Sequence, residues 1–187
     1  SGCPDEQVAP MSKWIVLLRG INVGGTMQVR MAELRGALTA AGCAKVASYI
    51  QSGNLVFESA LSRSEVSTLV TDVIEAEFGF RPSSLALKPE ELTEALAENP
   101  FPETTDPKTV HLWFAEEVPD PRATGELEQL ATETESWQLA GRVLYLHAPN
   151  GIGRSKLAAG AERKLGVPAT ARNMRTLTHL RTLSDQT

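Results

Sequence analysis

The fold is decided by residues 14–19, which read WIVLLR and are followed by Gly20. The run is apolar without alternation, which is typical of a strand that is buried on both faces. Alternate residues of a strand face opposite ways, so both faces of this strand are apolar. We therefore expect helices to cover one face of its sheet. Other protein is expected on the second face, either the other half of the chain or another subunit of a homo-oligomer.

Outward from this run, apolar periodicity predicts the order strand, helix, strand, strand, helix, strand. Ser62 and Glu65 match a capping box and begin the second helix, which is followed by Gly79. Ser52-Gly53-Asn54 is typical of a tight turn between two strands. The predicted strands are residues 14–19, 46–51, 55–58 and 83–87, and the predicted helices are residues 30–40 and 62–78.

The same order repeats after a short acidic helix that begins at Pro89 and a Pro-rich linker. The repeat contains strands at 110–115, 136–139, 143–147 and 169–172, helices at 120–131 and 155–165, and a final helix at 173–183. We infer an α+β fold of two tandem ferredoxin-like (βαββαβ) sandwiches, with antiparallel sheets and a C-terminal helix. The expected organisation is a leader at 1–10, a first half at 11–88, a helix and linker at 89–108, and a second half at 109–187.

Composition excludes several classes of protein. With 187 residues, 42% hydrophobic and 22% charged, the chain is too apolar for a disordered protein, and two cysteines are too few for a disulfide scaffold. No apolar run approaches the roughly 20 residues of a membrane span. Ser1–Pro10 lacks the apolar core of a secretory signal and is interpreted as a tag remnant or leader, with Met11 as the natural start. Cys43 is then the one cysteine inside the fold, which favours a small buried side chain in a reducing cytoplasm.

Charge is distributed unevenly along the chain. Residues 89–141 contain 13 Asp and Glu against two Lys and Arg, whereas residues 150–187 contain seven Lys and Arg against two Asp and Glu. The two segments either serve different partners or attract each other. A pI near 5.3 argues against general nucleic-acid binding but leaves room for one local basic site.

Three stretches combine turn residues, cations and helix starts. The first, residues 18–25, reads LRGINVGG and lies between a buried strand and a helix. Glycines and free amides at a helix start attract anions, although the lysine of a nucleotide-binding P-loop is missing here. A glycine turn needed only for chain geometry is the alternative. The candidate ligand-binding residues are Arg19, Asn22, Gly24 and Gly25.

The second stretch is Asn150-Gly151-Ile152-Gly153-Arg154-Ser155-Lys156 and the third is Arg172-Asn173-Met174-Arg175. Cations in a first helical turn oppose the helix dipole unless an anion lies between them. Two arginines can also hold a phosphate or carboxylate, with Asn173 as a helix cap. Solvated cations, or pairing with carboxylates of the acidic segment, are the alternatives. The candidates are Arg154, Ser155, Lys156, Arg172, Asn173 and Arg175.

Aromatic and histidine side chains recur on two neighbouring strands of the second half. His111 and Trp113 lie two apart on one strand, and Tyr145 and His147 lie two apart on the other. RNA-recognition modules stack bases on such positions, but the basic-aromatic pattern of an RNA platform is absent, so we favour packing against the last helix or the first sheet. The three histidines lack zinc-site spacing, and no nucleophile elbow is present. The sequence thus indicates no catalytic residue, metal or cofactor.

Several of these stretches resemble a known bacterial family. Residues 18–25, Met31-Ala32-Glu33-Leu34-Arg35, residues 49–57 (YIQSGNLVF), residues 154–157 (RSKL) and residues 169–173 (ATARN) are similar to the family called domain of unknown function 1697. The resemblance extends from about Met11 to about Leu183, with Met174 where a Trp is expected. It implies a small cytoplasmic bacterial protein with a ferredoxin-like α+β fold and no agreed activity.

Three hypotheses follow for function. The first is a non-catalytic module that binds a phosphorylated small molecule or a nucleic-acid backbone. There, Arg19 and Lys156 would neutralise charge, while the amides of Gly24 and Gly25 and the Ser155 hydroxyl would donate hydrogen bonds. The second is an enzyme acting on a small phosphorylated or carboxylated substrate. The third is a structural or partner-binding protein whose acidic segment docks on a basic surface.

Overall fold

The computed structural model describes residues 9–187. The predicted leader, Ser1–Pro10 with Cys3, lies outside the described residues except for Ala9 and Pro10. The described residues form an α+β structure with two four-stranded antiparallel sheets, six α-helices and one 3-10 helix. They divide into two compact units. Unit 1 contains the chain up to Pro89 together with Thr182–Thr187, and unit 2 contains Glu90–Arg181.

Unit 1 contains the first sheet, whose strand order is β2-β3-β1-β4. Its elements follow the predicted order, and their bounds differ from the predicted ones by two residues or fewer. They are β1 (Ser12–Arg19), α1 (Met31–Ala40), β2 (Ala44–Tyr49), β3 (Asn54–Ser59), α2 (Arg63–Phe78) and β4 (Ser83–Leu87). The capping box at Ser62 and Glu65 is present, and Gly79 ends α2 in the left-handed conformation.

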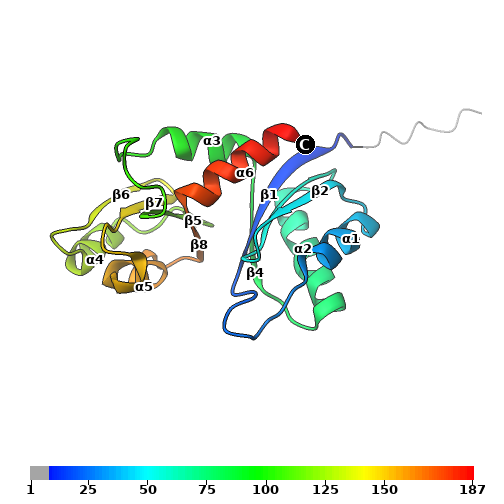
Figure 1. Ribbon diagram of the computed structural model, residues 1–187, viewed down its shortest axis with the longest axis horizontal. Coiled ribbons are helices and arrows are strands. Elements are labelled where there is room, and N and C mark those ends of the chain that lie inside the picture. The colour runs from blue at the N-terminus through cyan, green and yellow to red at the C-terminus, as the bar shows by residue number, and fades with distance from the viewer. Residues whose placement is uncertain (1–8) are drawn as a thin grey trace, which may run out of the picture. The chain divides into compact units, whose positions relative to one another are not determined.

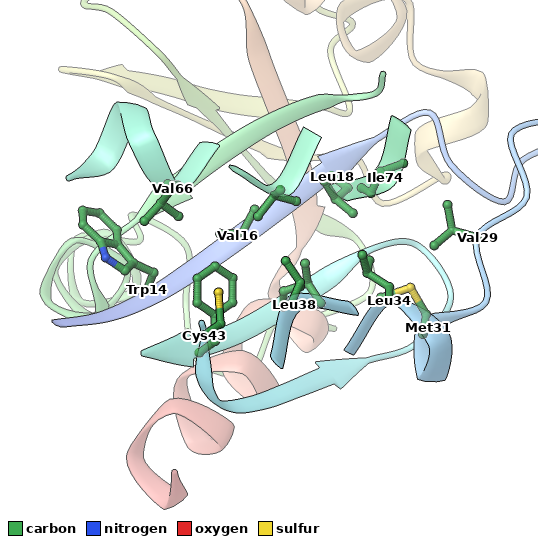
Figure 2. Close-up of a cluster of buried hydrophobic side chains, with 14 of the residues drawn as sticks. Trp14, Val16, Leu18, Val29, Met31, Leu34, Leu38, Cys43, Val66 and Ile74 are labelled. Atoms are coloured by element: carbon green, nitrogen blue, oxygen red, sulfur yellow. The ribbon is translucent and has the colours of Figure 1, made fainter. Parts of the chain in front are cut away.

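The central strand β1 is buried on both faces, as its apolar run predicts. It pairs antiparallel with β3 and with β4. Figure 2 shows Trp14, Val16 and Leu18 facing a layer that contains side chains of α1 and α2, and these residues form one core cluster. Ile15 and Leu17, which face the other way, are also buried.

The last turn of the C-terminal helix α6 (Met174–Gln186) is bonded to the same strand. Lys13 faces the same way as Ile15, and its Nζ donates hydrogen bonds to the carbonyl of Ser184 and, at 2.7 Å, to the carbonyl of Thr187. A cation suits the end of a helix because the last carbonyls there carry a partial negative charge. The second face of this sheet is thus covered by protein rather than left as an open platform.

Unit 2 contains the second sheet, whose strand order is β6-β7-β5-β8. Its helix-facing core joins Trp113, Leu144 and Leu146 with apolar residues of α4 and α5, which lie on one face of the sheet (Figure 1). The elements of this unit before α6 are α3 (Pro89–Ala97), β5 (Val110–Ala115), α4 (Ala123–Leu130), β6 (Ser136–Ala140), β7 (Val143–His147), the 3-10 helix η1 (Ile152–Arg154), α5 (Lys156–Leu165) and β8 (Ala169–Asn173).

Helix α3 is held against the other face of this sheet by a buried tyrosine. The Tyr145 hydroxyl donates a 2.7 Å hydrogen bond to the Ala95 carbonyl of α3. Burial raises the pKa of Tyr145 to about 12, and the nearby carboxylates of Glu98 and Glu94 act in the same direction. The hydroxyl therefore stays protonated and keeps donating this bond.

The aromatic and histidine residues of β5 and β7 lie on opposite faces of the second sheet, and Trp113 and Tyr145 pack inside the fold. In the β5–β7 pairing, Trp113 is opposite Leu144, while Leu112 is opposite Tyr145. Directly paired residues share a face of a sheet, so His111 and Trp113 lie on the helix-covered face and Tyr145 and His147 lie on the other. Trp113 and Tyr145 are both buried, and the strand register places them on opposite faces. They therefore form no joint platform.

Candidate functional site

The Gly-rich segment between β1 and α1 folds into a compact loop with repeated left-handed backbone conformations. Gly20, Gly24 and Gly25 have φ angles of 75°, 61° and 77°, and Asn22 has a φ of 53°. Val23 and Thr26 form an isolated bridge that closes the tip. Gly24 and Gly25 are exposed there, which agrees with the glycine-turn alternative without testing their predicted role as amide donors. At the start of the loop, Arg19 donates a 3.3 Å hydrogen bond to the Ser83 hydroxyl of β4.

Asn22 ties this loop to the turn between β2 and β3. Its Nδ2 donates to the carbonyls of Gln51 at 2.7 Å and Val29 at 3.0 Å, and its Oδ1 accepts from the Val29 amide at 2.7 Å. Both the donor and the acceptor of the Asn22 side chain are thus used in hydrogen bonds within the fold. Asn22, predicted as a ligand-binding residue, acts here as the residue that positions the two loops.

Gly53 brings the β2–β3 turn against β1. Its carbonyl accepts a 2.8 Å hydrogen bond from the Leu18 amide. A Cβ at this position would lie 2.7 Å from Leu18 Cβ and 2.7 Å from Ile21 Cδ1, and the φ angle is 91°. Only glycine satisfies both constraints without a shift of the neighbouring side chains.

An open pocket of about 560 Å³ lies where these two loops meet the start of α1. This volume falls in the usual range of small-molecule sites. Three carboxamides and two arginines supply its polar lining, and the lining residues are Asn22, Gln28, Val29, Arg30, Met31, Ala32, Arg35 and Gln51.

The pocket contains two cations in different states. Arg30 is exposed and forms an ion pair of 3.0 Å with Glu33. Arg35 is half-buried, and its Nη1 donates a 2.6 Å hydrogen bond to the Ser48 hydroxyl of β2. Within residues 9–187 this guanidinium has no carboxylate partner. Helical side chains lean toward the N-terminus, so Arg35 extends over the first turn of α1.

The start of α1 lacks a side-chain cap. Arg30 occupies the N-cap position in an extended conformation and makes no capping hydrogen bond, and the first bond within the helix runs from the Leu34 amide to the Arg30 carbonyl. The first amides of a helix have no intrahelical acceptor and carry a partial positive charge. The lining of the pocket is therefore electropositive from both the side chains and the backbone.

In the second predicted stretch, at the start of α5, the Ser155 hydroxyl is bonded to groups of the protein itself. Ser155 is buried, and its hydroxyl accepts from the Ala158 amide at 3.0 Å and donates to the Glu135 carboxylate. Burial of Glu135 raises its pKa, but hydrogen bonds from Ser155 and Thr132 outweigh burial and hold the pKa below its ordinary value. The Ser155 hydroxyl is thus already bonded within the protein, which leaves the predicted roles of Arg154 and Lys156 as predictions. Arg154 and Lys156 are both exposed.

The third stretch gives one confirmed prediction. Asn173 caps α6, since its Oδ1 accepts a 2.8 Å hydrogen bond from the Thr176 amide. Arg172 is half-buried on β8 and donates to the Ala171 carbonyl at 2.8 Å, and burial lowers its pKa to about 10. Arg175 is exposed in the first turn of α6.

Sequence reasoning missed Arg30, Arg35, Gln28 and Gln51 as lining residues of a pocket. One signal was available in the sequence. α2 and α5 each begin after a serine cap, whereas α1 and α4 begin after an arginine, at a position where Ser, Thr, Asp or Asn is preferred, and of these two only α1 follows the Gly-rich loop. An uncapped helix start after a Gly-rich loop marks a place where the amides face something other than a side chain.

Among residues 9–187, no group of three His, Cys, Asp or Glu side chains could hold a metal ion. Cys43 is buried, and burial raises the pKa of its thiol, so the side chain is a weak nucleophile. Burial likewise lowers the pKa of His111 to about 4. None of the described helices has the length and apolar character needed to cross a membrane.

Comparison with known families matches residues 11–145 to a protein family of unknown function, DUF1697. The chain belongs to this family. The DUF1697 chain is also similar in structure to a conserved bacterial protein, SP0830, from Streptococcus pneumoniae, with a TM-score of 0.70 and 29% sequence identity. That likeness covers 94% of this chain and 99% of the other. Comparison of this DUF1697 chain with curated proteins found no match.

Proposed function

We propose that this protein binds a small phosphorylated ligand in the pocket at the start of α1. The observation that carries the proposal is Arg35, a half-buried guanidinium in the pocket wall whose hydrogen-bond partner is the neutral Ser48 hydroxyl. A guanidinium binds phosphate in a bidentate manner, and such charge-assisted bonds are stronger than bonds between neutral groups.

Two further features support a phosphate rather than a neutral ligand. The first turn of α1 has no side-chain cap, and helix amides of this kind bind anions. Arg30 adds a second cation at the pocket mouth, although its ion pair with Glu33 is exposed and weak. Asn22 fixes the loops that form the wall, so the pocket is built before any ligand arrives.

The test is calorimetric titration of the full chain with orthophosphate and with a phosphomonoester such as glycerol phosphate. Loss of a charge-assisted hydrogen bond costs about 1.5–3 kcal/mol, so Arg35→Gln should weaken binding by about 10- to 100-fold. Lys156→Gln, at the start of α5, is the matched control and should bind as the wild type does.

Two results would overturn the proposal. One is the absence of binding by the wild type at millimolar phosphate, and the other is equal affinity of the wild type and Arg35→Gln. A short single-stranded RNA forms a third arm. RNA binding that Arg35→Gln leaves unchanged, without binding of phosphomonoesters, would favour a nucleic-acid backbone as the partner instead.

Two finer features accompany this proposal. We interpret both units as ferredoxin-like sandwiches in tandem, because the sheets share one strand order, with the third strand next to the first in each unit. We also propose a bacterial cytoplasmic protein. The buried thiol of Cys43 and the likeness to a Streptococcus pneumoniae protein support that interpretation.

A further inference from the structure

We infer that the ligand of this pocket is an organic phosphate with an apolar body, and that Met27 and Ile50 contact that body. The inference rests on the proposed function and specifies the class of ligand. The exposure and the left-handed backbone of Met27 and Ile50 are the observations that support it.

Exposed apolar side chains concentrate in the two loops that form the pocket wall. Among residues 9–187, six large apolar side chains are exposed, and three of them lie in these loops: Val23 (63% exposed), Met27 (49%) and Ile50 (50%). Single exposed apolar residues are ordinary, but a group of them beside a concave site marks a contact surface.

The backbone connects Met27 and Ile50 through the residues of the wall. The Met27 carbonyl accepts a 3.0 Å hydrogen bond from the Asn22 amide, and the Asn22 side chain donates to the carbonyl of Gln51, which follows Ile50. In Figure 1 the β1–α1 loop, drawn in dark blue, leaves the sheet at the end that carries the β2–β3 turn. Met27 and Ile50 each precede a lining residue, Gln28 and Gln51, so their backbone lies at the edge of the cationic pocket.

Ile50 is the more informative of the two residues. Its φ angle is 49°, in the left-handed region, where a β-branched residue is an outlier. An isoleucine tolerates such strain inside a core, where burial compensates, but half of this side chain is exposed. Asparagine adopts this conformation readily, so the turn geometry does not require isoleucine here. Strain that internal packing does not repay points to a contact outside the chain.

The size of the pocket points the same way. About 560 Å³ is far more than a bare phosphate needs, and Val29, Met31 and Ala32 contribute apolar atoms next to Arg35. The lining thus combines apolar atoms with polar groups that can fix the orientation of a ligand. Arg35 would hold the phosphate, and the apolar loop residues would hold the remainder of the molecule.

The experiment compares phenyl phosphate, glycerol phosphate and orthophosphate by calorimetry on the wild type and on Ile50→Asn. The wild type should bind phenyl phosphate about tenfold tighter than the other two probes, because only phenyl phosphate buries apolar surface. Ile50→Asn should lose most of that preference, bind orthophosphate as the wild type does, and show no decrease in Tm. Val118→Asn, an exposed apolar residue of unit 2, is the matched control and should change nothing.

The failures of the two proposals are distinguishable. Equal affinity for all three probes, unchanged by Ile50→Asn, would refute the apolar contact while leaving phosphate binding intact. Absence of binding of every phosphate would refute the proposed function itself. Vesicles of phosphatidylcholine with phosphatidic acid form the last arm. Ile50-dependent binding to these vesicles, without a preference for phenyl phosphate, would overturn the inference in favour of a lipid surface.

Discussion

The starts of α1 and α5 look alike in the sequence and differ in the structure. Each follows a strand and a loop that contains glycines, and each has cationic residues at its start. At α5 the Ser155 hydroxyl caps the helix and the Glu135 carboxylate supplies the negative charge. At α1 no side chain caps the first turn, and the residues of this turn line a pocket that also contains Arg35.

The difference teaches that cations at a helix start are not evidence for an external anion by themselves. Glu135 lies 20 residues before Ser155, so the chain pattern around Ser155 does not reveal its partner. The more informative signal is the missing cap. A helix whose first amides lack a side-chain acceptor leaves an unsatisfied electropositive end, whatever the charge of the neighbouring residues.

The largest expected effect is a difference in stability loss between glycine substitutions in the hairpin turns of the two units. Gly53→Ala should lower the free energy of unfolding by about 3 kcal/mol, because the new Cβ meets Leu18 and Ile21 and the backbone keeps a left-handed φ. Gly141→Ala, in the turn between β6 and β7, should cost only about 1 kcal/mol, since nothing lies within 4 Å of the new methyl group. Urea unfolding followed by circular dichroism measures both, and equal losses would remove the special role of Gly53.

A smaller effect is expected at the filled helix start. Ser155→Ala should lower the free energy of unfolding by about 1–2 kcal/mol, because α5 loses its cap and Glu135 loses a donor. The Glu135 pKa is lowered in the folded state, so the carboxylate stabilises the protein above its ordinary pKa of 4.5 and loses that contribution as the pH falls. The gap in Tm between wild type and variant should therefore shrink on acidification.

Ser62→Ala is the control for this effect, since the Ser62 hydroxyl caps α2 by accepting from the Glu65 amide and has no carboxylate partner among the described residues. It should cost about 1 kcal/mol. Glu135 would not stabilise the start of α5 if Ser155→Ala lost no more stability than Ser62→Ala and its Tm difference from the wild type stayed the same at acid pH.

The smallest expected change closes the open helix start. Arg30→Ser would place a serine three residues before Glu33, which reproduces the capping-box pattern of Ser62 and Glu65. It should raise the free energy of unfolding by about 0.5–1 kcal/mol while weakening phosphate binding several-fold, because the hydroxyl competes for the same amides. A variant that became more stable and bound phosphate as tightly as before would show that the ligand does not use the start of α1.

Most of the fold could be predicted from local patterns. The strands at Ser83–Leu87, Val110–Ala115 and Val143–His147 have the predicted bounds, because short, largely apolar segments between turn residues identify strands. Helix ends at Gly79 and Gly166 follow from the preference of glycine for the left-handed conformation. Errors elsewhere are one to three residues at element ends, where hydrogen bonds between strands decide the limits.

The candidate site was only partly predictable. The Gly-rich loop and Asn22 were identified, but the contacts of Asn22 within the fold and the role of Arg35 were overlooked. The role of Asn22 depends on Val29 and Gln51, and that of Arg35 depends on Ser48 of the next strand. The faces that Trp113 and Tyr145 occupy were unpredictable for the same reason, because they depend on the register between strands.

By itself, the sequence determined the order of helices and strands, the central strand with two apolar faces, and the caps at Ser62 and Asn173. These features depend on residues a few positions apart in the chain. Such residues lie close together in the local structure whatever the tertiary fold. Only the tertiary structure decided which helix start is filled by Glu135 and which opens on a pocket beside Arg35. Electrostatic satisfaction depends on distance in space, and residues 20 positions apart become neighbours only when the sheet has formed.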